Sequence, residues 1–277
     1  MTVIEAFILG LIQGASEFLP ISSSGHLSIA GRLMGFDPEG DNLLSFNILL
    51  HVATLVAVFI VYRNDILEMI KAFFGMVKDI FTGKGLRLKE FLYRRLIVML
   101  IVATIPATIA AFVLGDIIEN PALWQIGIFL MITAILLFLS EKLSGGKTDL
   151  EKMSSKKALG VGCFQALGTL PGISRSGSTI VGGLFCGLDK KTAVRFSFLM
   201  SVPAILGALV LDLKDMFTMT SQTLSPLPVA VGMVTSAVSG YFAIKFLLRL
   251  VEKSKLSYFS IYCVVAGIFA IILNFTI

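Results

Sequence analysis

Long uncharged apolar stretches recur along the chain, and each has about the length that crosses a lipid bilayer. A membrane-spanning helix needs about 20 apolar residues, because the hydrocarbon core of a bilayer is about 30 Å thick. The stretches cover residues 45–62, 95–114, 122–140, 196–212, 227–250 and 257–276. This pattern predicts an all-α polytopic membrane protein with six full transmembrane helices.

Two further apolar regions, residues 3–36 and 158–188, are interrupted by glycine, serine and proline. Each region is too long and too broken to form one straight helix. Non-helical backbone at membrane depth is tolerated where protein buries it or where it lines a cavity. We therefore predict a re-entrant hairpin in each region, formed by two short helices and the loop between them.

The composition agrees with a membrane protein and disagrees with a soluble one. Of the 277 residues, 56% are hydrophobic and 15% are charged, whereas soluble domains carry about 25% charged residues. The net charge of +5 comes from basic residues in particular loops, so we expect no nucleic-acid partner. The cysteines lie in apolar segments without CxxC spacing, and we interpret them as packing residues. They are Cys163, Cys186 and Cys263.

The charges of the predicted loops indicate an orientation in the cytoplasmic membrane. Basic residues concentrate in the loops 63–95 and 142–157 and in a turn with Lys253 and Lys255. The positive-inside rule assigns these loops to the cytoplasm. Acidic residues occupy the loops that would then face outside; they are Asp37, Glu39, Asp41, Asp116 and Glu119. Both termini then fall outside, and the two hairpins dip into the membrane from opposite faces.

The two hairpins resemble each other when the chain is aligned with itself at an offset of 152 residues. The identical pairs are Gln13–Gln165, Ile21–Ile173, Ser22–Ser174, Ser24–Ser176, Gly25–Gly177, Gly31–Gly183, Gly35–Gly187 and Asp37–Asp189. Each hairpin is followed by three predicted spans, so we predict one membrane domain made of two inverted-topology repeats, residues 1–145 and 146–277. Close helix packing through small residues is the alternative explanation, but it does not account for the matched order.

The first hairpin combines a carboxylate with a turn rich in hydroxyl groups. Gln13 and Glu17 are four residues apart and share one helix face. A carboxylate inside the membrane is costly, so Glu17 is a candidate metal ligand, general base or partner of a cation. Residues 22–25 offer amides and hydroxyls beside a helix N-terminus, which suits an anion. His26 in the same turn suits acid–base work, whereas we interpret the isolated His51 as structural.

The second hairpin contains the segment PGISRSGST, residues 171–179. The guanidinium of Arg175 can bind two oxygens of a carboxylate or a phosphate. Neighbouring hydroxyl groups belong to Ser174, Ser176, Ser178 and Thr179. Together the hairpins predict phosphate chemistry on a substrate with an apolar tail. Arg175 would bind the phosphate, while a serine or an activated water attacks it.

These motifs resemble those of the undecaprenyl-diphosphatases, the bacitracin-resistance family. That family has a (Glu/Gln)xxxGlu motif, an adjoining serine and histidine stretch, and a PGxSRSxxT motif, here Gln13–Glu17, residues 22–26 and residues 171–179. The resemblance covers essentially the whole chain. It implies hydrolysis of undecaprenyl diphosphate to the monophosphate carrier of cell-wall synthesis, with resistance to bacitracin. It also implies a divalent cation, Mg²⁺ or Ca²⁺, and a site that opens toward the outer face of a bacterial cell membrane.

The resemblance also implies roles for individual residues. Glu17 and Arg175 would be the essential pair, Ser23 or alternatively Ser22 the nucleophile, and His26 the acid–base or leaving-group partner. The substrate-binding set would be Gln13, Ser22, Ser24, Gly172, Ser174, Ser176, Gly177 and Thr179. Gln13 stands where many members have glutamate, so a metal would be held by Glu17 and the substrate phosphates.

Other functions remain open at this stage. A flippase for a polyprenyl phosphate would also need Arg175 and a pocket of hydroxyl groups, and inverted repeats are common in transporters. A purely structural membrane scaffold does not account for charged side chains in the apolar hairpins. The sequence leaves open whether serine or water attacks, and whether the protein is a monomer or a homodimer.

Overall fold

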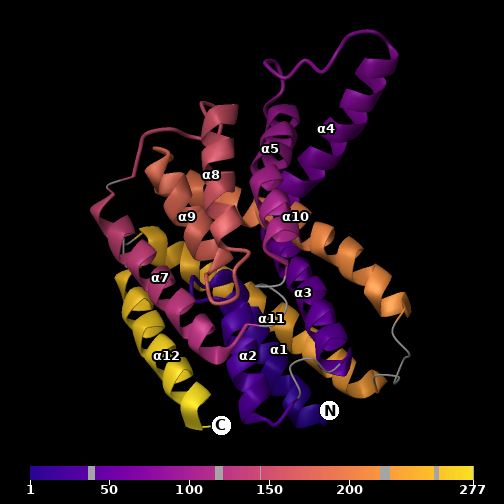
Figure 1. Cartoon of the computed structure of the whole chain (residues 1–277). Coiled ribbons are helices and arrows are strands. Elements are labelled where there is room, and N and C mark those ends of the chain that lie inside the picture. The colour runs from indigo at the N-terminus through magenta and orange to yellow at the C-terminus, as the bar shows by residue number, and fades with distance from the viewer. Residues whose placement is uncertain (37–40, 116–120, 144, 219–224, 253–255, 277) are drawn as a thin grey trace.

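The computed structural model describes residues 1–36, 41–115, 121–143, 145–218, 225–252 and 256–276 (Figure 1). Within the described part, regular secondary structure consists of helices and of an isolated bridge between Thr148 and Leu188. The helices are α1 (Val3–Phe18), α2 (Ser23–Leu33), α3 (Asp41–Val61), α4 (Arg63–Phe81), α5 (Leu92–Val113), α7 (Leu123–Lys142), α8 (Ser155–Leu167), α9 (Arg175–Phe185), α10 (Lys190–Thr218), α11 (Pro226–Glu252) and α12 (Ser257–Thr276).

The described helices confirm a polytopic membrane protein. Five of them have a segment that is long and apolar enough to cross a bilayer, and these segments lie in α5, α7, α10, α11 and α12. The helices α3 and α4 form a sixth candidate only when taken together, and they are bent by 92° relative to each other. Of the loop charges used above, Asp37, Glu39, Asp116, Glu119, Lys253 and Lys255 lie outside the described residues.

The prediction of a loop over residues 63–95 is wrong for its first part, because Arg63–Phe81 forms the helix α4. The many charges of this segment conceal apolar residues at helical spacing. Leu67, Ile70 and Phe74 lie three and four residues apart, and about half or more of each side chain is exposed. The helix therefore carries an apolar side and a charged side, which a reading based on charge alone misses.

Each predicted hairpin is a pair of helices joined by a short turn. The region 3–36 contains α1 and α2, and the region 158–188 contains most of α8 and the whole of α9. The first break follows from Pro20, which has no amide hydrogen and disfavours helix in the residue before it. Accordingly α1 ends at Phe18.

The two helix pairs share local structure at the same offset of 152 residues. The helix α2 begins and ends at positions that correspond to the ends of α9. The hydroxyl of Ser22 accepts a hydrogen bond from the amide of Gly25 at 3.4 Å, and that of Ser174 accepts one from Gly177 at 3.0 Å. Equivalent serines thus cap equivalent helices.

Small residues let the first helix of each pair approach a long apolar helix closely. The helix α1 packs on α11, and α8 packs on α5. A Cβ atom on Gly14 would lie 2.1 Å from the carbonyl oxygen of Ser236, and one on Gly162 would lie 2.3 Å from that of Ala103. The helices α7 and α12 run side by side along the same edge of the bundle (Figure 1). Both turns are thereby enclosed among the long helices.

Candidate active site

The two turns meet inside the bundle. The hydroxyl of Ser176 in the second turn donates a hydrogen bond to the carbonyl of Leu19 in the first turn at 3.2 Å. A Cβ atom added to Gly25 would lie 3.3 Å from the Cα of Gly172. The predicted hairpins therefore form one composite site rather than two separate ones.

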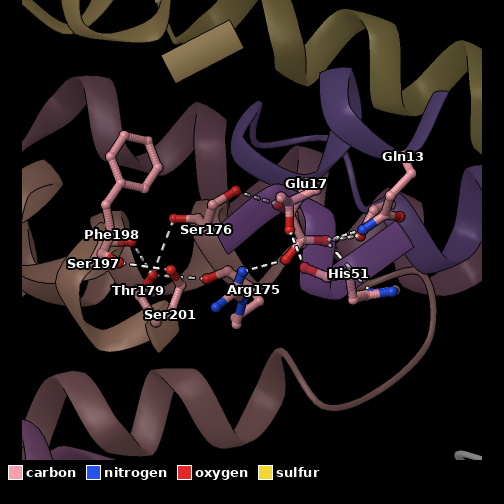
Figure 2. A network of polar contacts seen from close by, with 12 residues as sticks. Gln13, Glu17, His51, Arg175, Ser176, Thr179, Ser197, Phe198 and Ser201 are labelled. Atoms are coloured by element: carbon pink, nitrogen blue, oxygen red, sulfur yellow. Dashed lines mark hydrogen bonds and ion pairs between the residues drawn. The ribbon is translucent and has the colours of Figure 1, made fainter. Parts of the chain in front are cut away.

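The central contact of this site is an ion pair between Glu17 of α1 and Arg175 of α9. The Nη2 atom of Arg175 donates to Oε1 of Glu17, and Figure 2 shows the two side chains pointing toward each other. The Glu17 side chain is 4% exposed and that of Arg175 is 19% exposed. Burying such a pair is favourable only when both partners are present and hydrogen-bonded.

Three further side chains surround the other carboxylate oxygen of Glu17. Its Oε2 atom accepts hydrogen bonds from Nε2 of Gln13 at 2.9 Å and from Oγ of Ser23 at 2.6 Å. The Nε2 atom of His51 lies 3.6 Å from the same oxygen. The serine hydroxyl is thus aimed at a carboxylate that can take its proton.

The prediction that His51 is isolated is wrong, because its Nε2 atom lies 3.6 Å from Oε2 of Glu17, whereas its interpretation as a structural residue stays a prediction. His51 lies on α3, between Leu50 and Val52, and its local sequence contains no other polar group within two residues. Packing of α3 against α11 and α1 brings it to Glu17 (Figure 2). The only signal in the sequence was the presence of a histidine in an apolar span, and that signal does not identify a partner.

The guanidinium of Arg175 retains capacity for an anion. Its Nη1 atom is buried and has no hydrogen-bond partner within the protein. The helices α2 and α9 begin at Ser23 and Arg175, so the amide-bearing ends of both helices lie at the site. Helix N-termini attract negative charge. The arrangement therefore suits a phosphate group beside Arg175.

The backbone of the first turn is strained at Ser22. This residue has a φ angle of 70°, in a region of backbone conformation that residues other than glycine seldom adopt. Such conformations cost about 1–3 kcal/mol and cluster at functional sites. The Oγ atoms of Ser22 and Ser24 are 3.4 Å apart, while Ser23 points instead to Glu17. The strained conformation of Ser22 therefore directly precedes the serine whose side chain turns away from its neighbours and contacts Glu17.

A residue that the sequence did not reveal supports the second turn. The hydroxyl of Thr133 on α7 donates to the carbonyl of Gly172 at 3.1 Å and accepts from the amide of Ser174 at 3.0 Å. Gly172 has a φ angle of 107°, and a Cβ atom there would lie 2.7 Å from the carbonyl of Ile126. The turn that carries Arg175 thus needs both the glycine and the threonine.

The predicted hydroxyl groups of the second turn bind the protein itself. Ser174 and Ser176 have Oγ atoms 3.2 Å apart, and Ser176 also binds Leu19. The hydroxyl of Thr179 donates to the carbonyl of Arg175 at 2.8 Å and lies 2.6 Å from Oγ of Ser197 (Figure 2). These bonds fix the backbone from which Arg175 extends.

His26 is held on the side of the turn next to α12. Its Nδ1 atom lies 2.7 Å from the carbonyl oxygen of Ser22, and its Nε2 atom lies 2.7 Å from the hydroxyl of Tyr262. Both ring nitrogens are therefore engaged outside the Glu17–Arg175 pair. The sequence predicted that His26 lies beside the first turn, where the structure has it. It gave no indication of Tyr262 as a partner, because Tyr262 is 236 residues away along the chain.

The oxygen atoms around Glu17 fit a small divalent cation in part. Mg²⁺ and Ca²⁺ prefer carboxylate, amide and water oxygens, and Oε1 of Gln13 is buried without a hydrogen-bond partner. Among the described residues, no three His, Cys, Asp or Glu side chains gather as a metal site. Glu17 and Gln13 could therefore hold a cation only together with oxygens of a bound phosphate.

The chain is similar to known proteins over nearly its whole length. The family model of the bacitracin resistance protein BacA matches residues 6–269. The chain belongs to the BacA family. Curated relatives named undecaprenyl-diphosphatase include one from Alkaliphilus metalliredigens, 45% identical over 276 residues, which span 99% of each chain. Another, from Methanobrevibacter smithii, is 41% identical over 97% of this chain and 96% of its own.

Proposed function

We propose that this protein is a membrane phosphatase that hydrolyses undecaprenyl diphosphate to undecaprenyl phosphate and inorganic phosphate. This activity recycles the lipid carrier of cell-wall synthesis and confers bacitracin resistance. One observation carries the proposal beyond family membership. A buried carboxylate, Glu17, contacts both a serine hydroxyl and the guanidinium of Arg175, which has an unpartnered nitrogen for a phosphate.

The first step of the reaction is attack by Ser23 on the terminal phosphorus. Oε2 of Glu17 takes the proton from Oγ of Ser23, to which it is already hydrogen-bonded at 2.6 Å. A bond forms between Oγ and the terminal phosphorus, and the bond from that phosphorus to the bridging oxygen breaks. Undecaprenyl phosphate leaves, and Ser23 carries the phosphoryl group.

The second step returns the enzyme to its starting state. Water attacks the phosphoserine, and its oxygen and hydrogens stay with the phosphorus. The bond between Oγ and phosphorus breaks, Glu17 returns its proton to Oγ of Ser23, and inorganic phosphate is released. Arg175 stabilises the negative charge of the transferring group in both steps through its free Nη1 atom. Ser174, Ser176 and Thr179 act by holding the Arg175 backbone, while Ser22, Ser24, Gly172 and Gly177 shape the two turns.

A divalent cation, Mg²⁺ or Ca²⁺, belongs to the proposed site. Glu17 and Gln13 would hold it together with the diphosphate oxygens, and when bound it neutralises phosphate charge. Chelation is expected to reduce phosphate release by purified protein at least about tenfold, because electrostatic stabilisation of the phosphoryl group is lost. Added Mg²⁺ or Ca²⁺ should restore it. Full activity in excess chelator would contradict the cation.

The proposed topology is an inverted repeat, with six full spans and two re-entrant hairpins in one membrane domain. Matching serine caps at an offset of 152 residues support it, as do the packing of α1 on α11 and of α8 on α5. In Figure 1 the pair α8–α9 lies above α1–α2, and both termini lie at the lower end. We propose that this lower end faces outward from the bacterial cell membrane and that the site opens toward it.

Replacing Glu17 by glutamine tests the proposed reaction. The change keeps the shape of the side chain but removes the base for Ser23, so kcat should fall by about a hundredfold or more. The measurement is phosphate release from undecaprenyl diphosphate by purified protein in detergent, where no membrane exists across which lipid could move. A flippase would release no phosphate in this assay, and unchanged release by Glu17→Gln would overturn the role of the carboxylate.

A further inference from the structure

The imidazole of His26 is joined to the backbone of the catalytic turn. Its Nδ1 atom lies 2.7 Å from the carbonyl oxygen of Ser22. A carbonyl can only accept a hydrogen bond, so the hydrogen of the neutral ring resides on Nδ1. That carbonyl belongs to the peptide bond between the strained Ser22 and the proposed nucleophile Ser23. The histidine therefore restrains the backbone on which the nucleophile stands.

The opposite nitrogen of His26 is held by Tyr262 of α12. The tyrosine hydroxyl lies 2.7 Å from Nε2 and can donate to the lone pair that the neutral ring keeps there. The two rings are also nearly parallel, at an angle of 11°, with centroids 5.5 Å apart. Tyr262 thus stabilises the hydrogen position that the Ser22 carbonyl favours, and it fixes the orientation of the imidazole.

The helix that carries Tyr262 is anchored on both sides of this contact. The next residue, Cys263, is buried, and its Sγ atom lies 3.8 Å from the carbonyl oxygen of Pro20 in the same turn. Two residues earlier, the hydroxyl of Ser260 donates to the carbonyl of Ala134 on α7 at 2.7 Å. Although Tyr262 is 45% exposed, its position follows from a helix that is fixed against the turn and against α7.

We propose that Tyr262 is a positioning residue for the phosphatase reaction. It holds His26 in the tautomer with hydrogen on Nδ1, and His26 in turn holds the Ser22 carbonyl and the direction of Ser23. This inference rests on the proposed function, because it assigns Ser23 the role of nucleophile. It adds a residue of the last helix, far from both sequence motifs, to the machinery of the first turn.

The test is the variant Tyr262→Phe, which keeps the stacked ring and removes only the hydroxyl. Loss of one hydrogen bond of this kind is expected to lower kcat about tenfold while KM for undecaprenyl diphosphate changes little. The side-chain ¹⁵N NMR signals of protein labelled at histidine report the tautomer directly. The signals can be assigned, because the chain contains two histidines, His26 and His51. The His26 signals should shift from the Nδ1–H pattern toward a mixture of tautomers.

Internal controls separate this result from general damage. The His51 signals should stay unchanged in the same sample, and the matched variant Tyr241→Phe on α11 should leave both kcat and the His26 signals unchanged. The proposal is overturned if Tyr262→Phe leaves the His26 signals unaltered, or if they change while kcat does not. A wild-type protein that releases no phosphate would overturn the proposed function, whereas the NMR comparison would still decide whether Tyr262 controls His26.

Discussion

Replacing Arg175 by alanine is expected to lower kcat/KM for undecaprenyl diphosphate by about a thousandfold or more, because the main charge that stabilises the phosphoryl group is lost. The same change leaves the 4%-exposed carboxylate of Glu17 without its ion-pair partner. Breaking a buried pair in this way costs about 3–5 kcal/mol of stability. The measurements are steady-state phosphate release and thermal unfolding in the same detergent.

A matched control separates the two effects of this change. Arg195 on α10 forms an ion pair with Asp65 on α4, away from the two turns. Arg195→Ala should therefore also lower the unfolding temperature, while turnover per folded molecule stays close to that of the wild type. If Arg195→Ala abolishes turnover as completely as Arg175→Ala does, loss of activity reflects unfolding and the role of Arg175 in binding phosphate is wrong.

Replacing Ser23 by alanine is expected to reduce kcat by about a thousandfold or more, because the attacking oxygen is removed. The protein should remain stable, since Glu17 keeps its bonds to Arg175 and Gln13. Rapid acid quenching of the wild type during turnover, followed by mass spectrometry, should detect a phosphoserine at Ser23.

Ser28 supplies the control for this variant. It lies five residues later on α2, and its hydroxyl donates to the carbonyl of Ser24 at 2.9 Å. Ser28→Ala should retain turnover. If Ser23→Ala also retains it, water rather than serine attacks the phosphorus, and Glu17 would act on that water.

The helical membrane architecture was predictable in outline, because a membrane-spanning helix requires a long run of apolar residues that is visible in the sequence. Apolar length defined the long helices, and Pro20 together with the glycines and serines defined the broken pairs. The helix α4 was missed because its charges obscured the apolar residues between them. The relation between the two pairs was visible in matched residues such as Ser22 and Ser174, which prove to have the same capping role.

The sequence indicated the members of the site where a charge lay in an apolar hairpin or where hydroxyl groups gathered in a turn. A charged side chain in an apolar hairpin needs a partner, and this reasoning identified Glu17 and Arg175 from the sequence. The structure shows that they form an ion pair with each other. His51, Thr133 and Tyr262 reach the turns through tertiary packing of α3, α7 and α12. Each stands in an apolar span where a polar residue can equally well bond its own helix, so local sequence does not reveal its partner.

The central claim is that both turns form a single phosphatase site. The most direct test is phosphate release from undecaprenyl diphosphate by the purified wild type, by Ser23→Ala, by Arg175→Ala and by the double variant. Residues that act as a unit give non-additive losses, so the double variant should be no slower than the more damaged single variant. A wild type that releases no phosphate, or losses that multiply in the double variant, would contradict a single site built from the two turns.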